Sequence, residues 1–305
     1  MSLNSGIESK SASVWPLIIF TGLVFGLSGL LSKSLIDRGV DSFTVTAIPF
    51  LIGGGVAWLV AWQAGDIRRS ALRAGAMLGV LNSALPALFF NLGFETLPAG
   101  LVTLILSLGP VLTAAVAHLV FDDEHFTVMK GVGLGVAFGG VTALIAAPGV
   151  IEGASYRGAA WATAGAVLAG GSAILNRLFA VRHGALALIG PQLSVAGITP
   201  IIVGSLVGRA LVPEGGFAGG DLLIMALIGV GASYAGVRTL MLSNQRGTTG
   251  QVAMVSYLIP LVGVIGGIVF FDERLTPWIV FGGGLILAGI ALGGRASAPS
   301  PPADI

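Results

Sequence analysis

The amino-acid sequence predicts an all-α integral membrane protein: ten transmembrane helices arranged as two five-helix inverted repeats around a central cavity. Three observations lead to this prediction: an apolar composition, ten apolar stretches of helical length, and motifs that recur later in the chain. Of the 305 residues, 55% are hydrophobic and only 10% are charged, and the mean hydropathy is +0.96. A soluble domain usually carries about a quarter charged residues, so this chain is suited to a lipid environment.

The apolar stretches have the length that a membrane-spanning helix needs. A hydrocarbon core about 30 Å thick takes roughly 20 residues of helix. The stretches do not alternate apolar and polar residues, as the strands of a membrane barrel would. Charged or Gly/Pro-rich breaks divide the chain into spans near residues 14–36, 43–63, 74–94, 97–120, 127–147, 158–180, 185–207, 221–242, 249–271 and 277–294.

Charge placement predicts the orientation of these spans. More Lys and Arg residues fall on the side of the N-terminus, largely because of the loop GDIRRSALRA (65–74). Cytoplasmic loops carry such an excess, so we expect both termini to be cytoplasmic. Residues 1–13 are then a cytoplasmic segment and residues 295–305 a disordered cytoplasmic tail.

Motifs of the first half recur in order in the second half. The offset drifts between 142 and 150 residues, and each half holds five spans. Because five is odd, the half at 157–294 crosses the membrane in the opposite direction to the half at 14–147, as in many secondary transporters. The matches pair 26–33 with 170–177, Pro49 with Pro191, 77–84 with 227–234, Pro110 with Pro260, and Gly133 and Gly140 with Gly282 and Gly289.

Proline and glycine are placed where helices would bend or approach closely. Pro110 and Pro260 each remove a helical hydrogen bond inside the fourth helix of their half, so we expect them, with Pro86, to bend gate helices. The acidic turns 122–125 and 272–274 are expected to cap the helices that follow them. The Gly-rich faces, among 48 Gly in all, are predicted to be packing seams.

These features resemble the EamA-type branch of the drug/metabolite transporter superfamily. The shared features are a Pro-bearing fourth helix with an acidic turn in each half, a Gly-rich fifth helix, the start ETLPAG (95–100), and Lys33 at the end of the first span. The second half has GTTGQVA where the first has LPAGLVT, so these two starts are only approximately equivalent. The resemblance, closest to aromatic amino acid exporters, implies alternating-access export of amino acids, aromatic and other apolar ones, and related metabolites. It also implies a central cavity lined mainly by the first, third, fourth, sixth, eighth and ninth helices.

Polar and aromatic side chains near mid-span are the candidates for contacting a substrate, because polar groups in a membrane usually face a cavity or a partner. Interhelical hydrogen bonding is the alternative for the amide, hydroxyl and phenol groups, and packing for the phenylalanines. The tryptophan could anchor a span at the interface, and the arginine could snorkel to it. The predicted substrate-binding residues are Asn82, Phe89, Phe90, Ser107, Trp161, Tyr234, Arg238 and Tyr257.

The remaining composition bears on energy coupling and on other functions. All fourteen carboxylates fall in loops, tails or span ends, which predicts weak or absent proton coupling. The sequence predicts no enzyme, cofactor, metal site or nucleic-acid partner, because its histidines are not spaced as ligands and it has no Walker A motif and no basic tract. Its expected partners are a small-molecule substrate and the lipid bilayer, with the chain as a monomer. A multidrug or organic-cation exporter, and more remotely a membrane scaffold or sensor, are the alternatives.

Overall fold

The computed structural model describes residues 14–109, 112–113, 127–146, 156–213, 215–246, 252 and 254–295. Over these residues the chain is helical and contains no strand, which confirms the predicted fold class. The first half contains α1 (Trp15–Asp37), α2 (Ser42–Gln63), α3 (Arg69–Leu78), η1 (Gly79–Ala84), α4 (Leu85–Phe94), α5 (Ala99–Leu106) and α7 (Val128–Ala146). The second contains α8 (Tyr156–His183), α9 (Ala185–Leu206), α10 (Gly219–Leu227), η2 (Ile228–Gly236), α11 (Val237–Arg246), α13 (Val255–Phe271) and α14 (Pro277–Arg295).

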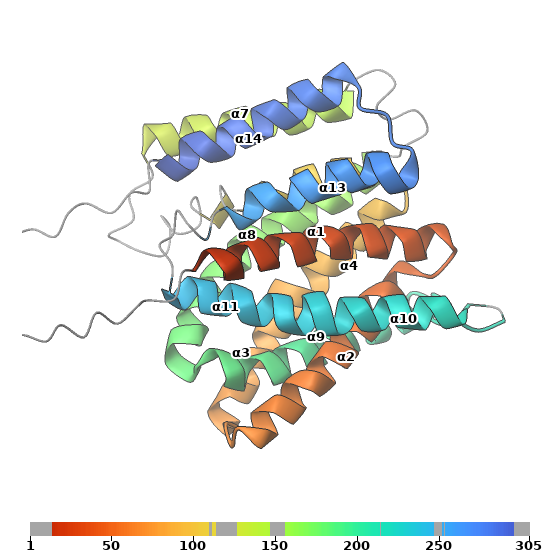
Figure 1. Ribbon diagram of the computed structural model, residues 1–305, viewed down its shortest axis with the longest axis vertical. Helices are drawn as coiled ribbons and strands as arrows, with labels where there is room; N and C mark the ends of the chain where they lie inside the picture. Colours follow the sequence, from red (N-terminus) through yellow and green to blue (C-terminus); the bar gives the residue numbers. More distant parts are fainter. Residues whose placement is uncertain are drawn as a thin grey trace, which may run out of the picture.

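Most helices lie side by side and run roughly from left to right in Figure 1. The described ends of the chain lie at the same end of this bundle. We call this the terminal end; the far end carries the loops after α1, α4, α9 and α13. Six helices of the described part are long and apolar enough to cross a membrane, by length and composition, and three further apolar helices are shorter. The six are Trp15–Asp37, Ser42–Gln63, Arg69–Phe94, Tyr156–Ala180, Ala185–Leu206 and Gly219–Arg246; the shorter ones are Gly131–Leu144, Val255–Phe271 and Pro277–Leu292.

The two halves pack on each other reciprocally. Helix α1 packs on α13, and its counterpart α8 packs on α5; likewise α3 and η1 pack on α9, while η2 and α10 pack on α2. Helices α7 and α14 pair at the top of Figure 1 and α2 and α9 pair lower down, each with its own counterpart. A two-fold relation between inverted halves requires this pattern of contacts.

Glycines make the closest contacts between the halves. A methyl group on Gly26 would lie 3.1 Å from the carbonyl oxygen of Ile259, and one on Gly170 would lie 2.7 Å from that of Gly109. The offsets between the repeats relate Gly26 to Gly170 and Gly109 to Ile259. Each contacted carbonyl directly precedes the proline of a fourth helix, so the first helix of each half rests on that point of the other half.

The pair of fifth helices repeats the same arrangement. A methyl group on Gly140 would lie 2.6 Å from the carbonyl oxygen of Gly282, and one on Gly289 would lie 2.5 Å from that of Gly133. The predicted repeat pairs 133/282 and 140/289 therefore meet each other across the contact. This confirms the prediction that the Gly-rich faces are packing seams.

The third helix of each half contains a π-helical segment at the recurring motif. The segment η1 lies within residues 77–84, and η2 begins at the equivalent point of the second half. Single π-helical turns are rare and occur frequently at functional sites. The motif therefore marks the same backbone irregularity twice.

The prolines that we predicted to bend helices occupy different positions. Pro260 is buried inside α13, whereas Pro86 lies in the first turn of α4, directly after η1. Pro110 lies outside the described residues. The bending of gate helices at these positions stays a prediction.

The close packing of α7 on α14 can be tested with two adjacent glycines. We expect Gly140→Ala to lower the thermal unfolding midpoint in detergent, because its methyl group meets backbone atoms, and overpacking costs about 1–3 kcal/mol. Gly139→Ala is the matched control, because no atom outside its own helix lies within 4 Å of the added methyl group. Equal midpoints for the two variants would contradict the packing described here.

Candidate functional site

Asn82 joins the two halves through hydrogen bonds between side chains. From η1 its Nδ2 donates to Ser172 Oγ at 3.0 Å, and its Oδ1 accepts from Asn176 Nδ2 at 3.2 Å; both partners are on α8. Gln192 of α9 completes the group, with Nε2 donating to Ser83 Oγ at 2.9 Å. The structure thus places Asn82 at the interface between the halves.

Four residues of this group, Ser83, Ser172, Asn176 and Gln192, were not predicted from the sequence to contact a substrate. Ser172 and Asn176 lie one helical turn apart in the recurring stretch 170–177, and Gln192 follows Pro191 in an otherwise apolar span. A search for amide side chains near the middle of a span would have found Gln192. Only the packing shows that it faces η1.

Aromatic candidates also meet across the halves, between α4 and α8. The rings of Phe89 and Trp161 lie 5.0 Å apart with a tilt of 39°. Phe90 packs against α8 as well, where a methyl group on Gly165 would come within 3.0 Å of its ring. These three rings are half-buried, so part of each is open to a neighbouring group.

Ser107 and Tyr257 differ in how far their side chains are exposed. Ser107 is buried, and its hydroxyl donates to the carbonyl oxygen of Thr103 at 3.0 Å within the same helical stretch. Tyr257 of α13 is half-buried and packs against the apolar cluster built around α5, α7 and α8. Their predicted contact with a substrate stays a prediction.

Tyr234 and Arg238 form a separate pair on η2 and α11. Arg238 Nη1 donates to the Tyr234 hydroxyl at 3.0 Å, and both line a cavity of about 330 Å³ with Phe20 of α1. Phe20 belongs to an exposed apolar stripe with Leu23 and Leu27, so this cavity reaches the surface that a bilayer covers. The position agrees with the snorkelling alternative for Arg238.

At the far end, charged side chains link the two halves. Arg209 Nη1 lies 3.1 Å from Asp41 Oδ2 and 3.7 Å from Glu95 Oε1, and Arg38 Nη1 lies 3.3 Å from Asp221 Oδ1. Each pair joins a helix end or loop of one half to a helix end or loop of the other. Such partly exposed pairs contribute about 0–1 kcal/mol each, so they favour one arrangement of the halves more than they stabilise the fold.

Glu273 adds a fourth contact between the halves at this end. Its carboxylate accepts hydrogen bonds from the backbone N–H groups of Ala99, at 2.5 Å, and Gly100, at 3.1 Å, which begin α5. Asp272 ends α13 with a φ of 53°, in the left-handed region, and this turn directs Glu273 back toward α5. A carboxylate at a helix N-terminus is stabilising, since free N–H groups and the positive end of the dipole meet it.

The prediction that this acidic turn caps the following helix is therefore wrong for residues 272–274. The hydroxyl of Thr276 caps α14, accepting from the N–H of Ile279 at 3.2 Å, and Glu273 caps the fourth helix of the other half. The turn at 122–125 lies outside the described residues.

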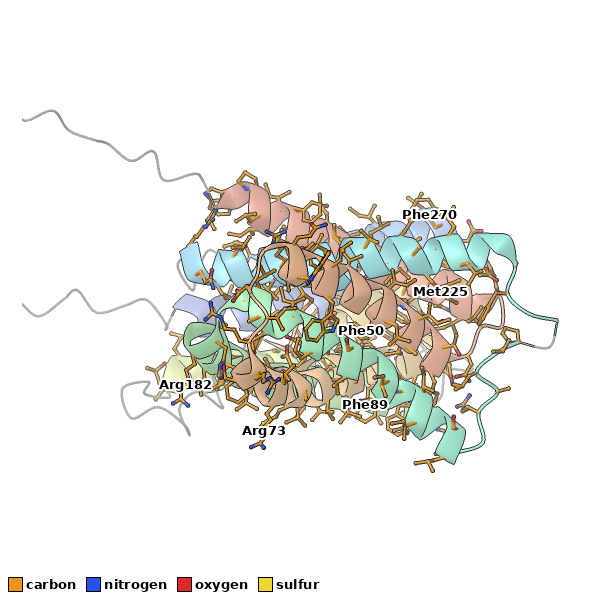
Figure 2. The ribbon with its side chains drawn as sticks, turned by 90° about the horizontal axis from the view of Figure 1, so that it is seen from below. Phe50, Arg73, Phe89, Arg182, Met225 and Phe270 are labelled. Carbon is orange, nitrogen blue, oxygen red and sulfur yellow. The ribbon has the colours of Figure 1, made fainter. Side chains whose placement is uncertain are left out.

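The terminal end carries basic residues with fewer ion pairs. Among the described residues its ion pair is the local one between Asp66 and Arg68. Figure 2 shows Arg73 and Arg182 toward the terminal end and Met225 and Phe270 toward the far end. Over the described ranges, charged contacts thus join the halves at the far end only.

The described carboxylates all lie at helix ends or in loops, at positions 37, 41, 66, 95, 221, 272 and 273. The described residues contain no group of three or more His, Asp or Glu side chains placed to hold a metal ion. Away from the far end, the groups that meet between the halves in the described part of the chain are therefore amides, hydroxyls and aromatic rings. They suit the binding and release of a small solute.

Comparison with known proteins gives matches over both halves. The sequence profile of the EamA-like transporter family matches residues 13–146 and 156–294. The uncharacterized transporter YvbV of Bacillus subtilis is 27% identical over 90% of each chain. A protein of Streptantibioticus cattleyicolor named "Probable terminal-alkyne amino-acid exporter" is 25% identical over 95% of this chain and 98% of its own. One crystal structure superimposes with a TM-score of 0.60 over 89% of this chain and 95% of that chain at 19% identity, which shows the fold alone.

The contact of Glu273 with α5 predicts a pH-dependent stability. Burial raises the pKa of Glu273 above its ordinary value of 4.5, against the opposing effects of the two N–H groups and Lys33, while Asp37 adds to the increase. The folded protein thus holds this proton more tightly than the unfolded chain does. Its contribution to stability rises as the pH falls from neutrality through the raised pKa toward 4.5.

We expect Glu273→Gln to remove this contribution, because the amide does not titrate. Thermal unfolding midpoints measured in detergent from neutral pH down to about pH 5 check it. The wild-type midpoint should increase relative to that of the variant as the pH falls. Parallel curves would contradict the assignment.

Proposed function

Because this chain belongs to the EamA-like transporter family, we propose that it exports amino acids, aromatic and other apolar ones, with related small metabolites, by alternating access. The chain is a multi-pass membrane transporter. The proposal places it in the bacterial inner membrane with both termini in the cytoplasm, so that the far end faces outward. It acts there as a monomer that contacts lipid and solute.

One observation carries the proposal: polar and aromatic side chains from opposite halves meet where the halves pack on each other. Asn82 bonds to Ser172, and Phe89 lies against Trp161. In transporters built from inverted repeats the solute site lies between the repeats, and a relative motion of the halves exposes it to each side in turn. Aromatic rings there would contact apolar side chains of a solute by burial and stacking.

Two further findings favour amino acids over organic cations. One full-length relative is named as an exporter of an amino acid. An organic cation would require a carboxylate near the middle of the bundle, whereas the described carboxylates lie at helix ends. The reciprocal packing of the halves also supports a moving transporter over a static scaffold.

Counterflow in liposomes of purified protein tests this function. Labelled phenylalanine should accumulate in liposomes preloaded with unlabelled phenylalanine, and Trp161→Ala should lower the rate about tenfold by removing the ring that meets Phe89. Trp278→Ala is the matched control, since Trp278 is exposed on α14 and meets Phe281 of the same helix.

The same liposomes test energy coupling. We propose that transport has no strong proton coupling, so an imposed pH gradient should change the counterflow rate little. Absent counterflow in the wild type would overturn the function, and a steep dependence on the gradient would overturn the mode of coupling.

Substitution of Pro260 tests whether α13, the fourth helix of the second half, must bend during transport. Pro260→Ala supplies an N–H that α13 lacks, so a straighter helix forms more easily. We expect slower counterflow at unchanged yield in the membrane. Pro200→Ala, inside α9, is the control for replacing a proline within a span; equal effects of both variants would remove the special role of Pro260.

A further inference from the structure

Five neutral polar side chains meet where η1, α8 and α9 come together, and we call this group the junction site. It consists of Asn82 and Ser83 from η1, Ser172 and Asn176 from α8, and Gln192 from α9. The first half supplies two of the five and the second half three. The site therefore depends on how the halves are placed.

Gln192 has one unsatisfied atom in this group. Its side chain is only 1% exposed, and its Nε2 donates to Ser83 Oγ at 2.9 Å and to Asn82 Oδ1 at 3.5 Å. Its Oε1 is buried and has no hydrogen-bond partner among the described residues. An acceptor held in an apolar interior without a donor costs free energy, so the site is built to receive a donor.

The neighbours fix which way the Gln192 amide points. The opposite orientation would bring Oε1 toward Asn82 Oδ1, and two acceptor oxygens repel. Asn82 Oδ1 already accepts from Asn176, which holds it in place. The free position at Gln192 is thus an acceptor oxygen.

The surroundings set the charge and the direction of approach of the missing donor. No charged side chain bonds to the five within the described part of the chain, so a neutral O–H or N–H fits better than an ammonium group. Asn82 and Asn176 keep part of their surface open, whereas Gln192 is enclosed. In the arrangement that we infer below, a ligand group approaches from the side of these two asparagines.

We propose that the junction site is a specificity subsite for a neutral hydrogen-bond donor on an aromatic side chain, a phenol O–H or an indole N–H, with Gln192 Oε1 as its acceptor. The inference rests on the proposed export of amino acids. The π-helical turn η1 serves this subsite by placing the adjacent Asn82 and Ser83 toward partners on two different helices.

The subsite has a measurable consequence for selectivity. A site with a buried polar group discriminates against an analogue that leaves the group unpaired. The transporter should therefore prefer tyrosine to phenylalanine, since the two differ only by the hydroxyl. Gln192→Met removes the acceptor at similar volume, so the tyrosine-to-phenylalanine counterflow ratio should fall about tenfold.

The experiment measures counterflow of labelled tyrosine and labelled phenylalanine in liposomes of the full-length protein. Asn176→Leu, which removes a neighbour of the acceptor group, should also lower the ratio and serves if Gln192→Met does not fold. Ser194→Ala is the matched control on the same helix, because Ser194 accepts from Trp58 Nε1 at 2.9 Å, outside the junction site.

The outcomes separate the subsite from the function. A lower tyrosine-to-phenylalanine ratio in the Gln192 or Asn176 variant, with an unchanged ratio in Ser194→Ala, supports the subsite. An unchanged ratio with intact phenylalanine counterflow overturns it, and water alone then fills the position. Absence of counterflow for every amino acid in the wild type overturns the proposed function, and the subsite with it.

Discussion

Close approach of helix backbones in lipid is the constraint on which the rest of this structure depends. Lipid tails are as apolar as leucine, so burial of apolar surface does not drive helices together inside a bilayer. Association must come from van der Waals contact and interhelical hydrogen bonds, and glycine permits both by letting backbones touch. At Gly140 and Gly289 an added methyl group would meet a carbonyl oxygen of the opposite helix within 2.6 Å. The same contacts, reciprocal across the two-fold relation, hold the fifth helices together.

Polar contacts add direction to this packing. Glycine contacts depend on close approach, whereas the hydrogen bonds of Asn82 and Gln192 also require particular distances and angles between donor and acceptor. They lie beside a π-helical turn, where the backbone is already irregular. The same region therefore joins the halves and presents polar groups between them, which a solute site between moving repeats needs.

The sequence predicted the spans, the inverted repeat and the glycine seams because each depends on local composition or on recurrence along the chain. Asn82 and Phe89, which were chosen from polarity and helical spacing, lie where the two halves pack on each other, and their contact with a substrate stays a prediction. The sequence did not predict that Glu273 caps α5, because the left-handed turn at Asp272 brings the carboxylate to a helix far away in the chain. Gln192 was missed for a related reason, because its hydrogen-bond partners lie on η1, a helix far away in the chain.

The repeat also carries different charges at the two ends of the bundle. The offset of 150 pairs Asp221 with Ala71 and Glu95 with Gln245, so these two acids of the far-end ion pairs have neutral counterparts in the other half. Arg38 keeps a basic counterpart in Arg182. At positions 71 and 245 the chain therefore carries no acid with which to copy these two far-end ion pairs. Two inverted halves with equal charges would favour both arrangements equally; here the charges favour the arrangement in which the far end is joined. Each pair contributes about 0–1 kcal/mol, and about 1.4 kcal/mol in total would shift the ratio of two arrangements of the halves tenfold.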